Sequence, residues 1–596
     1  MTDARRTSRG IAVLVRAAPG ALAGLMVAQV VEGLVPAVVV SASATLVDNA
    51  ELADRSDAAR QAATSALVVI AAALAIGRVA TASVSMLASL VHHRFSAAVD
   101  QLCMESVCRL PGMAHFDDAR LADSLQAAQW ASQAGTMVNY SGFFVRWAAQ
   151  AAGSAVVAAR VGWWVPLLIF CTPVPGAVVA WRHIGEQKGL RMRRMDAVRH
   201  ARYGAELAVG LEPARELRLF GLGRWLLDRQ SRQWSVASAP LLADMRRELS
   251  HSLVAAAAKM ALATVPFAVA YHQFHDGRLS AGDFSAAVAA LGSVLVTVRW
   301  LETFPAEARA AAQFLPELMA LVDLAESDPR LAVAGTRPAP APVAAGVRFE
   351  GVRFAYPGTA AAVLDGFDLW LPAGSSLALV GENGAGKSTV VKLLCRFYDP
   401  DEGRITVDGV DLRDLDLGQW RRQLAVVFQD FARLPLSVAE NVGIGCVERI
   451  DDRALLHDAA EEANAAGVVA ALPHGWDTTL GRDFGGVELS GGEWQRVALA
   501  RAMATRLGRS ASVLVFDEPT AALDARVEHD LYERFARLTE GSTTLLISHR
   551  FSTVRMADRI AVVEDGRVVE VGTHDELLST GGRYAALFAL QAGRFA

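Results

Sequence analysis

The sequence predicts two domains of different kinds, an α-helical membrane domain with six transmembrane helices and an α/β domain that follows it. At 596 residues the chain is too long for one compact domain. Residues 1–325 consist largely of Ala, Val and Leu in long runs, whereas residues 348–596 mix charged residues, glycine and turn signals evenly. Between them, the alternating Pro and Ala of residues 326–347 favour an extended linker.

Six segments of the first domain are long and apolar enough to cross a bilayer. A membrane core of about 30 Å requires about 20 mostly apolar residues in a helix. Gly162 and the pair Trp163 and Trp164 separate the third segment from the fourth, as expected for a turn at the membrane interface. The predicted segments are residues 17–46, 62–91, 134–158, 162–181, 249–272 and 282–304.

The flanking charges predict the orientation, because loops that stay in the cytoplasm retain Lys and Arg. Basic residues follow the fourth segment, whereas the connection after the first is mostly acidic. We therefore expect a multi-pass protein of the cell membrane, with both termini and the connections 92–133 and 182–248 in the cytoplasm. The basic residues after the fourth segment are Arg182, Lys188, Arg191, Arg193, Arg194, Arg199 and Arg202. The acidic residues after the first segment are Asp48, Glu51, Asp54 and Asp57.

Composition and local sequence argue against a nucleic-acid-binding protein, an N-terminal signal peptide and a cysteine metal site. The net charge of -5 and the pI near 6.3, without a basic stripe in residues 348–596, argue against a nucleic-acid partner. The basic N-terminus precedes a long apolar stretch without a clear cleavage site, which favours a retained membrane helix over a signal peptide. The five cysteines lack metal-ligand spacing, so we expect them to be reduced and structural.

In the second domain, apolar strands alternate with helical stretches, which predicts a mainly parallel sheet. The segment GENGAGKST, residues 381–389, follows the strand LALV and opens a helix, the context that a phosphate-binding loop of a P-loop NTPase requires. Glycines let backbone N–H groups surround the phosphates at a helix N-terminus. Lys387 would neutralise the β- and γ-phosphates of ATP, and Ser388 would bind Mg²⁺. The expected nucleotide-binding residues are Gly381, Asn383, Gly384, Gly386, Lys387, Ser388 and Thr389.

Two carboxylates follow a second buried strand. The run Ser512 to Phe516 ends at Asp517 and Glu518. Asp517 suits coordination of Mg²⁺, and Glu518 can polarise the attacking water, as phosphoryl transfer requires. Taken alone, a strand that ends in two acids fits a capped turn equally well.

The segment LSGGEWQR, residues 489–496, decides between these alternatives, because here the chain resembles the ABC transporter ATPases by their signature motif. A second helix N-terminus with small residues offers further N–H groups to phosphate. The resemblance implies that Ser490, Gly491 and Gly492 complete the ATP site of an opposite subunit, so that two nucleotides lie between two such domains.

Four further residues stand where the resemblance implies a role. Tyr356 would stack on adenine, with a core strand residue as the alternative, and Gln429 would sense Mg²⁺ and the γ-phosphate. Asp524 would communicate across the dimer, and His549 would contact the γ-phosphate. The departures from the family pattern are minor: Ala521 replaces a commoner Ser, and Glu493 and Trp494 follow the signature glycines.

The membrane half resembles the exporter type, type I or type IV, in which the membrane domain precedes the ATPase. Residues 115–126 and 214–225 resemble the two cytoplasmic loops that dock on the ATPase, or they are ordinary solvated amphipathic helices. Because Glu518 and His549 are both retained, the resemblance implies two competent sites and favours a homodimer over a heterodimer. The expected ligands are ATP and Mg²⁺, and the expected partners are a second copy, membrane lipid and a cargo.

Four basic residues fall within or near the predicted helices, where an ionisable group is costly unless it faces water or a partner. One hypothesis is a basic cavity for an anionic cargo. In the alternative, the helices extend beyond the bilayer and the side chains reach the interface or pair with Glu302. The residues are Arg78, Arg146, Lys259 and Arg299.

Two stretches of the ATPase domain bear on the cargo. Residues 428–441 and the segment LSGGEWQR are similar to exporters of lantibiotics and related modified peptides. A peptide is therefore the leading prediction, with drugs, lipids and other hydrophobic small molecules as alternatives. Uptake of siderophores stays open because the sequence does not fix direction. Soluble ABC ATPases of translation or DNA repair are excluded by the six membrane segments.

Overall fold

Two units make up the protein, and each is described by itself. The computed structural model describes residues 3–50, 52–110, 112–113, 116, 136–171, 174, 203–204, 207–210, 213–293, 315–327, 335–359, 361–518, 541–548 and 550–592. The first unit combines Met1–Ser106 with Asp123–Asp323, and the second combines Val107–Ala122 with Leu324–Ala596. A short stretch between the predicted membrane segments thus belongs with the C-terminal unit.

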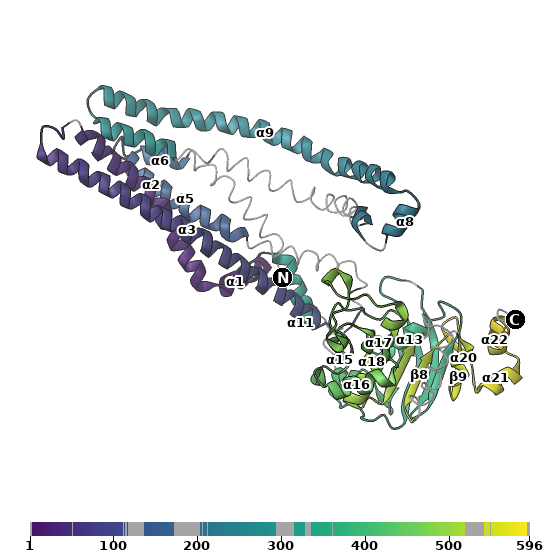
Figure 1. The fold of residues 1–596 in the computed structure, drawn as a ribbon. Helices are drawn as coiled ribbons and strands as arrows, with labels where there is room; N and C mark the ends of the chain where they lie inside the picture. The colour runs from purple at the N-terminus through teal and green to yellow at the C-terminus, as the bar shows by residue number, and fades with distance from the viewer. Residues whose placement is uncertain are drawn as a thin grey trace. The chain divides into compact units, whose positions relative to one another are not determined.

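The first unit is built from helices (Figure 1). Most run for many turns, because apolar residues without internal glycine or proline clusters favour uninterrupted helices. Residues 281–293 are also helical. The elements are α1 (Asp3–Ala17), α2 (Pro19–Ala50), α3 (Asp57–Cys108), α5 (Thr136–Ala158), α6 (Val165–Cys171), α8 (Ala214–Leu219), α9 (Gly223–His275) and α11 (Leu315–Ser327).

Three helical stretches are long and apolar enough to cross a membrane within the described residues: Pro19–Ala50, Asp57–Cys108 and Leu249–His275. They coincide with the first, second and fifth predicted segments. The third segment corresponds to α5, whereas the fourth and sixth are described only in part. The helices α3 and α9 continue well past the predicted ends, because the polar residues beyond the apolar stretches still satisfy the helical hydrogen-bond pattern.

Close packing of α2 on α5 depends on two glycines. A Cβ on Gly33 would lie 2.2 Å from the carbonyl oxygen of Arg146, and one on Gly153 would lie 2.6 Å from Cβ of Ala37. Within a bilayer the hydrophobic effect does not drive helices together, so their association depends on close van der Waals packing. Small residues permit that close approach. The backbones of α2 and α5 therefore meet at two places that larger side chains would close.

The second unit contains two sheets. The first is a four-stranded antiparallel sheet in the order β2-β1-β4-β5, and the second is a six-stranded sheet in the order β10-β9-β3-β8-β7-β6. In the second sheet only β10 is antiparallel, so the predicted mainly parallel sheet is confirmed. The strands are β1 (Gly346–Phe354), β2 (Leu364–Pro372), β3 (Ser376–Val380), β4 (Glu402–Val407), β5 (Val410–Asp411), β6 (Leu424–Val427), β7 (Val513–Asp517), β8 (Thr543–Ile547), β9 (Arg559–Glu564) and β10 (Arg567–Gly572).

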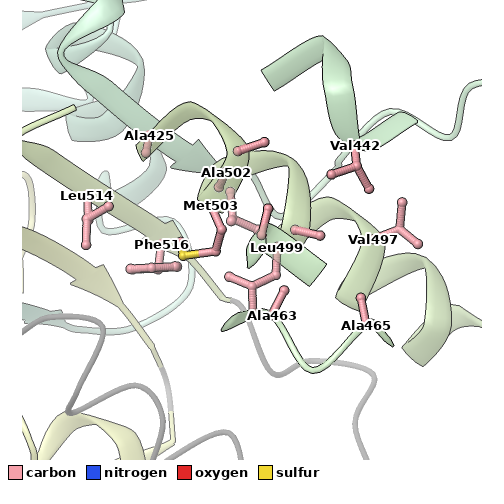
Figure 2. Close-up of a cluster of buried hydrophobic side chains, with 14 of the residues drawn as sticks. Ala425, Val442, Ala463, Ala465, Val497, Leu499, Ala502, Met503, Leu514 and Phe516 are labelled. Carbon is pink, nitrogen blue, oxygen red and sulfur yellow. The ribbon is translucent and has the colours of Figure 1, made fainter. Parts of the chain in front are cut away.

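Helices pack on the larger sheet around α18 (Figure 2). Leu499 and Met503 of α18 belong to the same buried cluster as Leu514 and Phe516 of β7. Burial of such side chains is worth about 1.5–3 kcal/mol each, which fixes the helix against the strand that carries the acidic pair. The helices of this unit are α13 (Lys387–Leu394), α14 (Leu417–Arg422), α15 (Val438–Gly443), α16 (Arg453–Glu462), α17 (Ala466–Ala471), α18 (Gly491–Arg509), α20 (Phe551–Val554), α21 (His574–Thr580) and α22 (Arg583–Ala592).

All five cysteines are free thiols. Cys395 and Cys446 are buried in the second unit, in keeping with the structural role expected of them. Cys108 and Cys171 are exposed, and Cys103 is half-buried. For these three the prediction of a structural role is therefore not supported.

Candidate functional site

The glycine-rich segment forms a loop between the end of β3 and the start of α13. Gly384 and Gly386 have φ angles of +86° and +97°, which residues with a Cβ rarely adopt. A Cβ on Gly381 would lie 2.2 Å from the carbonyl oxygen of Val563. Glycine is therefore required at these positions for the loop to turn tightly and present its N–H groups at the N-terminus of α13.

Lys387 lies inside this loop. Its side chain is buried, and its ammonium group donates to the carbonyl oxygens of Gly381 (2.7 Å) and Glu382 (2.8 Å). Burial lowers the pKa of Lys387, while the negative charges of Glu518 and Asp517 oppose that shift. The ammonium is thus positioned in the loop where a phosphate would lie, facing the two acidic residues.

The acidic pair and its neighbours converge on the loop. The hydroxyl of Ser388 donates to Oδ1 of Asp517 over 3.4 Å. Asp517 is buried at the end of β7, and burial raises its pKa. The amide of Gln429 donates to Oε2 of Glu518 over 2.9 Å. Residues from β3–α13, the end of β6 and the end of β7 thus meet at one edge of the sheet.

Glu518 is held in an unusual backbone conformation. Its φ of +50° lies in the left-handed region, and its N–H donates to the carbonyl oxygen of Ile547 in β8 over 2.9 Å. Strained backbones of this kind persist where the surrounding structure determines them, and they cluster at functional sites. In this conformation the carboxylate accepts the hydrogen bond from Gln429.

The donors around Ser388 fit a magnesium ion. A hydroxyl, a carboxylate and an amide oxygen from Ser388, Asp517 and Gln429 are hard oxygen ligands, and Mg²⁺ usually takes only one or two carboxylates plus water and substrate phosphate. Within the described residues no cluster of three or more His, Cys, Asp or Glu side chains occurs. Ser388, Asp517 and Gln429 would hold Mg²⁺ together with the phosphates of a nucleotide.

Tyr356 follows the end of β1 and is half-buried. Its ring packs against those of Phe354 and Tyr398, with centroid distances of 5.1 and 5.4 Å. Its hydroxyl lies 3.1 Å from Oγ1 of Thr389, on the helix that follows the phosphate loop, and Lys392 lies 5.0 Å from the ring centroid. The ring is thus fixed beside α13, and its stacking on adenine stays a prediction.

The signature motif begins α18. Ser490 is its N-cap and forms a capping box with Glu493, whose carboxylate accepts from the N–H and the hydroxyl of Ser490 at 2.8 Å each. These two hydrogen bonds, from the N–H first, lower the pKa of Glu493. Ser490 and Gly491 are exposed, so this ordered helix N-terminus is accessible to a ligand on another subunit.

Some predicted residues fall beyond what the structure describes. Asp524, His549 and Arg299 lie outside the described residues, as do residues 117–126 of the first predicted docking loop. The remaining nucleotide-site residues all lie in the second unit.

A contact just before that docking loop was not singled out from the sequence. The N–H of Met113 donates to the carbonyl oxygen of Phe397 over 2.9 Å, and a Cβ on Gly112 would lie 2.9 Å from the same oxygen. The ring of Phe397 lies 5.9 Å from that of Phe428, which precedes Gln429. In the sequence, only Gly112 of LPGM could have indicated this contact, because a glycine permits close approach of another backbone segment.

In the membrane part, Arg146 is paired. Its guanidinium donates to Oε1 of Glu32 over 2.9 Å, and Thr81 lies 3.0 Å from the same oxygen. Arg146 therefore has a partner, as the second hypothesis proposed, but the partner is Glu32 on α2, and Glu302 lies outside the described residues. Arg78 is exposed on α3. A cavity lined by unpaired basic residues is thus not supported at Arg146.

The family model of the ABC transporter matches residues 364–521. An ATP-dependent lipid A-core flippase of Chromohalobacter salexigens is 44% identical over 252 residues, which is 42% of this chain and 42% of the relative. ABC transporter B family member 28 of Arabidopsis thaliana is 45% identical over 246 residues, 41% of this chain and 34% of the relative. A lipid A-core flippase of Alcanivorax borkumensis is 36% identical over 312 residues, 52% of each chain. The matched regions thus span about half of these relatives or less.

The match to a solved structure extends over the whole chain. A bacterial Atm1-family ABC exporter with ATP bound is 28% identical, with a TM-score of 0.73, and the match covers 98% of this chain and 99% of that one. The predicted fold class is therefore confirmed: a helical membrane domain fused to an α/β ATPase domain, in the architecture of an ABC exporter.

Proposed function

We propose that this chain, an ABC exporter by fold, is an ATP-hydrolysing half-transporter that works as a dimer and exports an amphipathic or hydrophobic small molecule. One observation carries the proposal. Lys387, Ser388 and the pair Asp517 and Glu518 converge with Gln429 at one sheet edge. The same chain has helices that can cross a membrane. The domain boundaries 1–325, 326–347 and 348–596 are part of this proposal.

Hydrolysis follows from the geometry of the acidic pair. The carboxylate of Glu518 accepts a proton from water, the water oxygen attacks the γ-phosphorus of ATP, and the bond from that phosphorus to the bridging oxygen breaks to give ADP and phosphate. Lys387 and the loop N–H groups stabilise the charge that develops on the phosphate oxygens. Ser388, Asp517 and Gln429 would hold Mg²⁺, which neutralises charge on the β- and γ-phosphates.

A second copy completes the site. The N-terminus of α18, with Ser490, Gly491 and Gly492, would face the nucleotide bound by the partner, and Asp524 would lie at the same interface. The match to an exporter structure with ATP bound supports ATP as the nucleotide of this site. Because Glu518 and His549 are both present in the sequence, two identical copies would form two competent sites.

Two contacts would couple the ATPase to the membrane helices. The N–H of Met113 donates to the carbonyl oxygen of Phe397, whose ring lies 5.9 Å from that of Phe428, and this supports a docking role for the connection 92–133. The second predicted loop, residues 214–225, exposes large apolar side chains at Leu219, Phe220 and Trp225. Exposed apolar patches mark interaction sites, and we assign this one to docking on an ATPase domain, as the resemblance of residues 214–225 implies.

A lipid or drug-like cargo fits better than a peptide. The peptide prediction depended on residues 428–441 and on the signature motif, which belong to the ATPase domain and not to the membrane path. The relatives named above include two lipid A-core flippases and a plant ABC transporter of the B family. We further propose the cell membrane as the location, with the ATPase domain and both termini in the cytoplasm.

The test is ATPase activity and transport by the full chain reconstituted in lipid vesicles of known orientation. Three classes of cargo are compared: phospholipids and glycolipids, hydrophobic drugs, and modified peptides, with Glu518→Gln as the blank. Stimulation and outward movement of the lipid or drug class support the proposal. Stimulation by peptides alone, or net movement toward the ATPase side, would contradict the assigned cargo or direction.

A further inference from the structure

We propose that Arg583, the first residue of α22, is a positioning residue for the phosphate loop. Its guanidinium donates to Oε1 of Glu382, the second residue of the loop, over 2.6 Å, and contacts Oε1 of Glu564 at 3.0 Å. The inference rests on the proposed function, since it assumes that this loop binds ATP.

The start of α22 is itself fixed. Both carboxylate oxygens of Glu570 accept backbone N–H groups at this end of the helix, from Arg583 at 2.5 Å and from Tyr584 at 3.0 Å. A carboxylate here satisfies helix N–H groups that have no partner within the helix. The ring of Tyr584 is fully buried, and its hydroxyl lies 2.7 Å from Nδ1 of His574 in α21. Arg583 therefore extends from an anchored helix.

The position of Glu382 affects the orientation of Lys387. The backbone carbonyl of Glu382, together with that of Gly381, accepts the hydrogen bonds of the Lys387 ammonium. A movement of Glu382 therefore moves the group that orients Lys387. The ion pair between the Glu382 side chain and Arg583 therefore restrains the position of the Glu382 carbonyl group.

The same helix also packs against α20. The ring of Phe551, two residues after His549 in the sequence, lies 5.4 Å from that of Tyr584 and 5.2 Å from that of Phe588. A surface pocket of about 190 Å³ lies between α22, the end of β9 and the phosphate loop. The helix α22 thus contacts both α20 and the phosphate loop, and through Arg583 it holds the loop.

The test measures nucleotide affinity and the split between KM and kcat in the reconstituted full chain. The variants are Arg583→Ala, Arg583→Lys, Glu382→Ala and the double alanine variant. Because the pair is exposed, each single alanine variant should raise Kd and KM for ATP about two- to fivefold, with kcat nearly unchanged. The double variant should be no worse than either single one, and Arg583→Lys should retain most of the wild-type affinity.

A matched control is available in Arg453→Ala. Arg453 forms an equally short exposed ion pair with Asp477, at 2.6 Å, in α16 and the segment after α17. This variant should bind ATP like the wild type. If the effects of Arg583→Ala and Glu382→Ala multiply in the double variant, or if neither changes Kd, the positioning role is refuted. If the wild type itself binds no ATP, the proposed function fails instead. Should Arg583→Ala not fold, Arg583→Lys and Glu382→Ala still decide the question.

Discussion

Glu518 is the single residue on which the proposed chemistry depends most. Its left-handed backbone, the bond of its N–H to Ile547 and the hydrogen bond from Gln429 together hold the carboxylate in one place. A left-handed conformation costs about 1–2 kcal/mol in a residue with a Cβ. The hydrogen bonds to Ile547 and Gln429 offset part of that cost and hold the proposed base in position.

We expect Glu518→Gln to bind ATP but to hydrolyse it about 10²- to 10⁴-fold more slowly, because the loop and Lys387 are unchanged while the proton acceptor is lost. Nucleotide binding and phosphate release, measured on the same sample, check this. Glu402→Gln, at an exposed carboxylate of β4, is the control and should hydrolyse normally. Wild-type turnover in Glu518→Gln would mean that another group is the base.

The convergence of Lys387, Ser388 and Asp517 could be predicted from short motifs without knowledge of the fold, and their role toward a nucleotide stays a prediction. Glu32 could not be predicted as the partner of Arg146, since the two lie 114 positions apart and only the packing of α2 on α5 brings them together. Arg583 and Glu382 are 201 positions apart, and the same reason applies.

Among contacts between helices, we expect the ion pair of Glu32 on α2 and Arg146 on α5 to contribute most to the stability of the membrane domain. The carboxylate of Glu32 is largely buried, and its Oε2 has no hydrogen-bond partner in the described part of the chain. Removing one member of such a pair leaves a buried charge without compensation, which is more costly than removing both.

Arg146→Gln should therefore lower the stability of the detergent-solubilised protein by about 1–3 kcal/mol, less than for a fully buried pair because Arg146 is partly exposed. Adding Glu32→Gln should recover much of that loss. Thermal unfolding of the two single variants and the double variant measures the difference. A double variant as unstable as Arg146→Gln alone would show that the pair is not the cause.

We propose that the connection carrying Gly112 and Met113 links the membrane helices to the ATPase domain. A side chain at position 112 would press on the carbonyl oxygen of Phe397, because the Cβ would lie only 2.9 Å away. We expect Gly112→Val to weaken this contact and reduce stimulation of the ATPase by cargo about two- to thirtyfold, while basal hydrolysis continues.

Gly467→Val is the control for that substitution, since nothing lies within 4 Å of the added Cβ. Steady-state ATPase activity with and without cargo distinguishes the outcomes. Equal loss of basal and stimulated activity would place the defect in the catalytic site instead of the connection.

The limits of the membrane helices show what hydropathy alone misses. The apolar stretches 62–91 and 249–272 were located correctly, but α3 and α9 run on as single helices to Cys108 and back to Gly223. Hydropathy marks where lipid lies, whereas backbone hydrogen bonding decides where a helix ends. The parallel sheet was predictable because βαβ units impose it, but the separate sheet that contains β1 and β2 has no comparable motif.

At the scale of the whole molecule, the proposed dimer predicts complementation. In a shared site, a chain with Lys387→Met and a chain with Ser490→Arg would together form one site with both lesions and one intact site. Each variant alone should be inactive. Equal mixtures, assembled from dissociated chains, should regain about a quarter of the wild-type sites, because half of the dimers are mixed.

Single-turnover hydrolysis of ATP in these mixtures is the measurement, and mixing either variant with itself is the control. Recovery of activity only in the mixed sample supports sites built by two chains. Activity of Ser490→Arg alone at the wild-type level would mean that one chain completes its own site.

The distribution of thiols has a practical consequence for spectroscopy. Between residues 324 and 596 the two cysteines are buried, and burial raises the pKa of Cys395 to about 12, so almost none of it is the reactive thiolate at neutral pH. Cys103, Cys108 and Cys171 are more accessible. Maleimide dyes or spin labels will therefore leave Cys395 and Cys446 unlabelled. If Cys103, Cys108 and Cys171 are replaced by serine, a single cysteine introduced beside the phosphate loop can be labelled selectively and would report the motion of that loop.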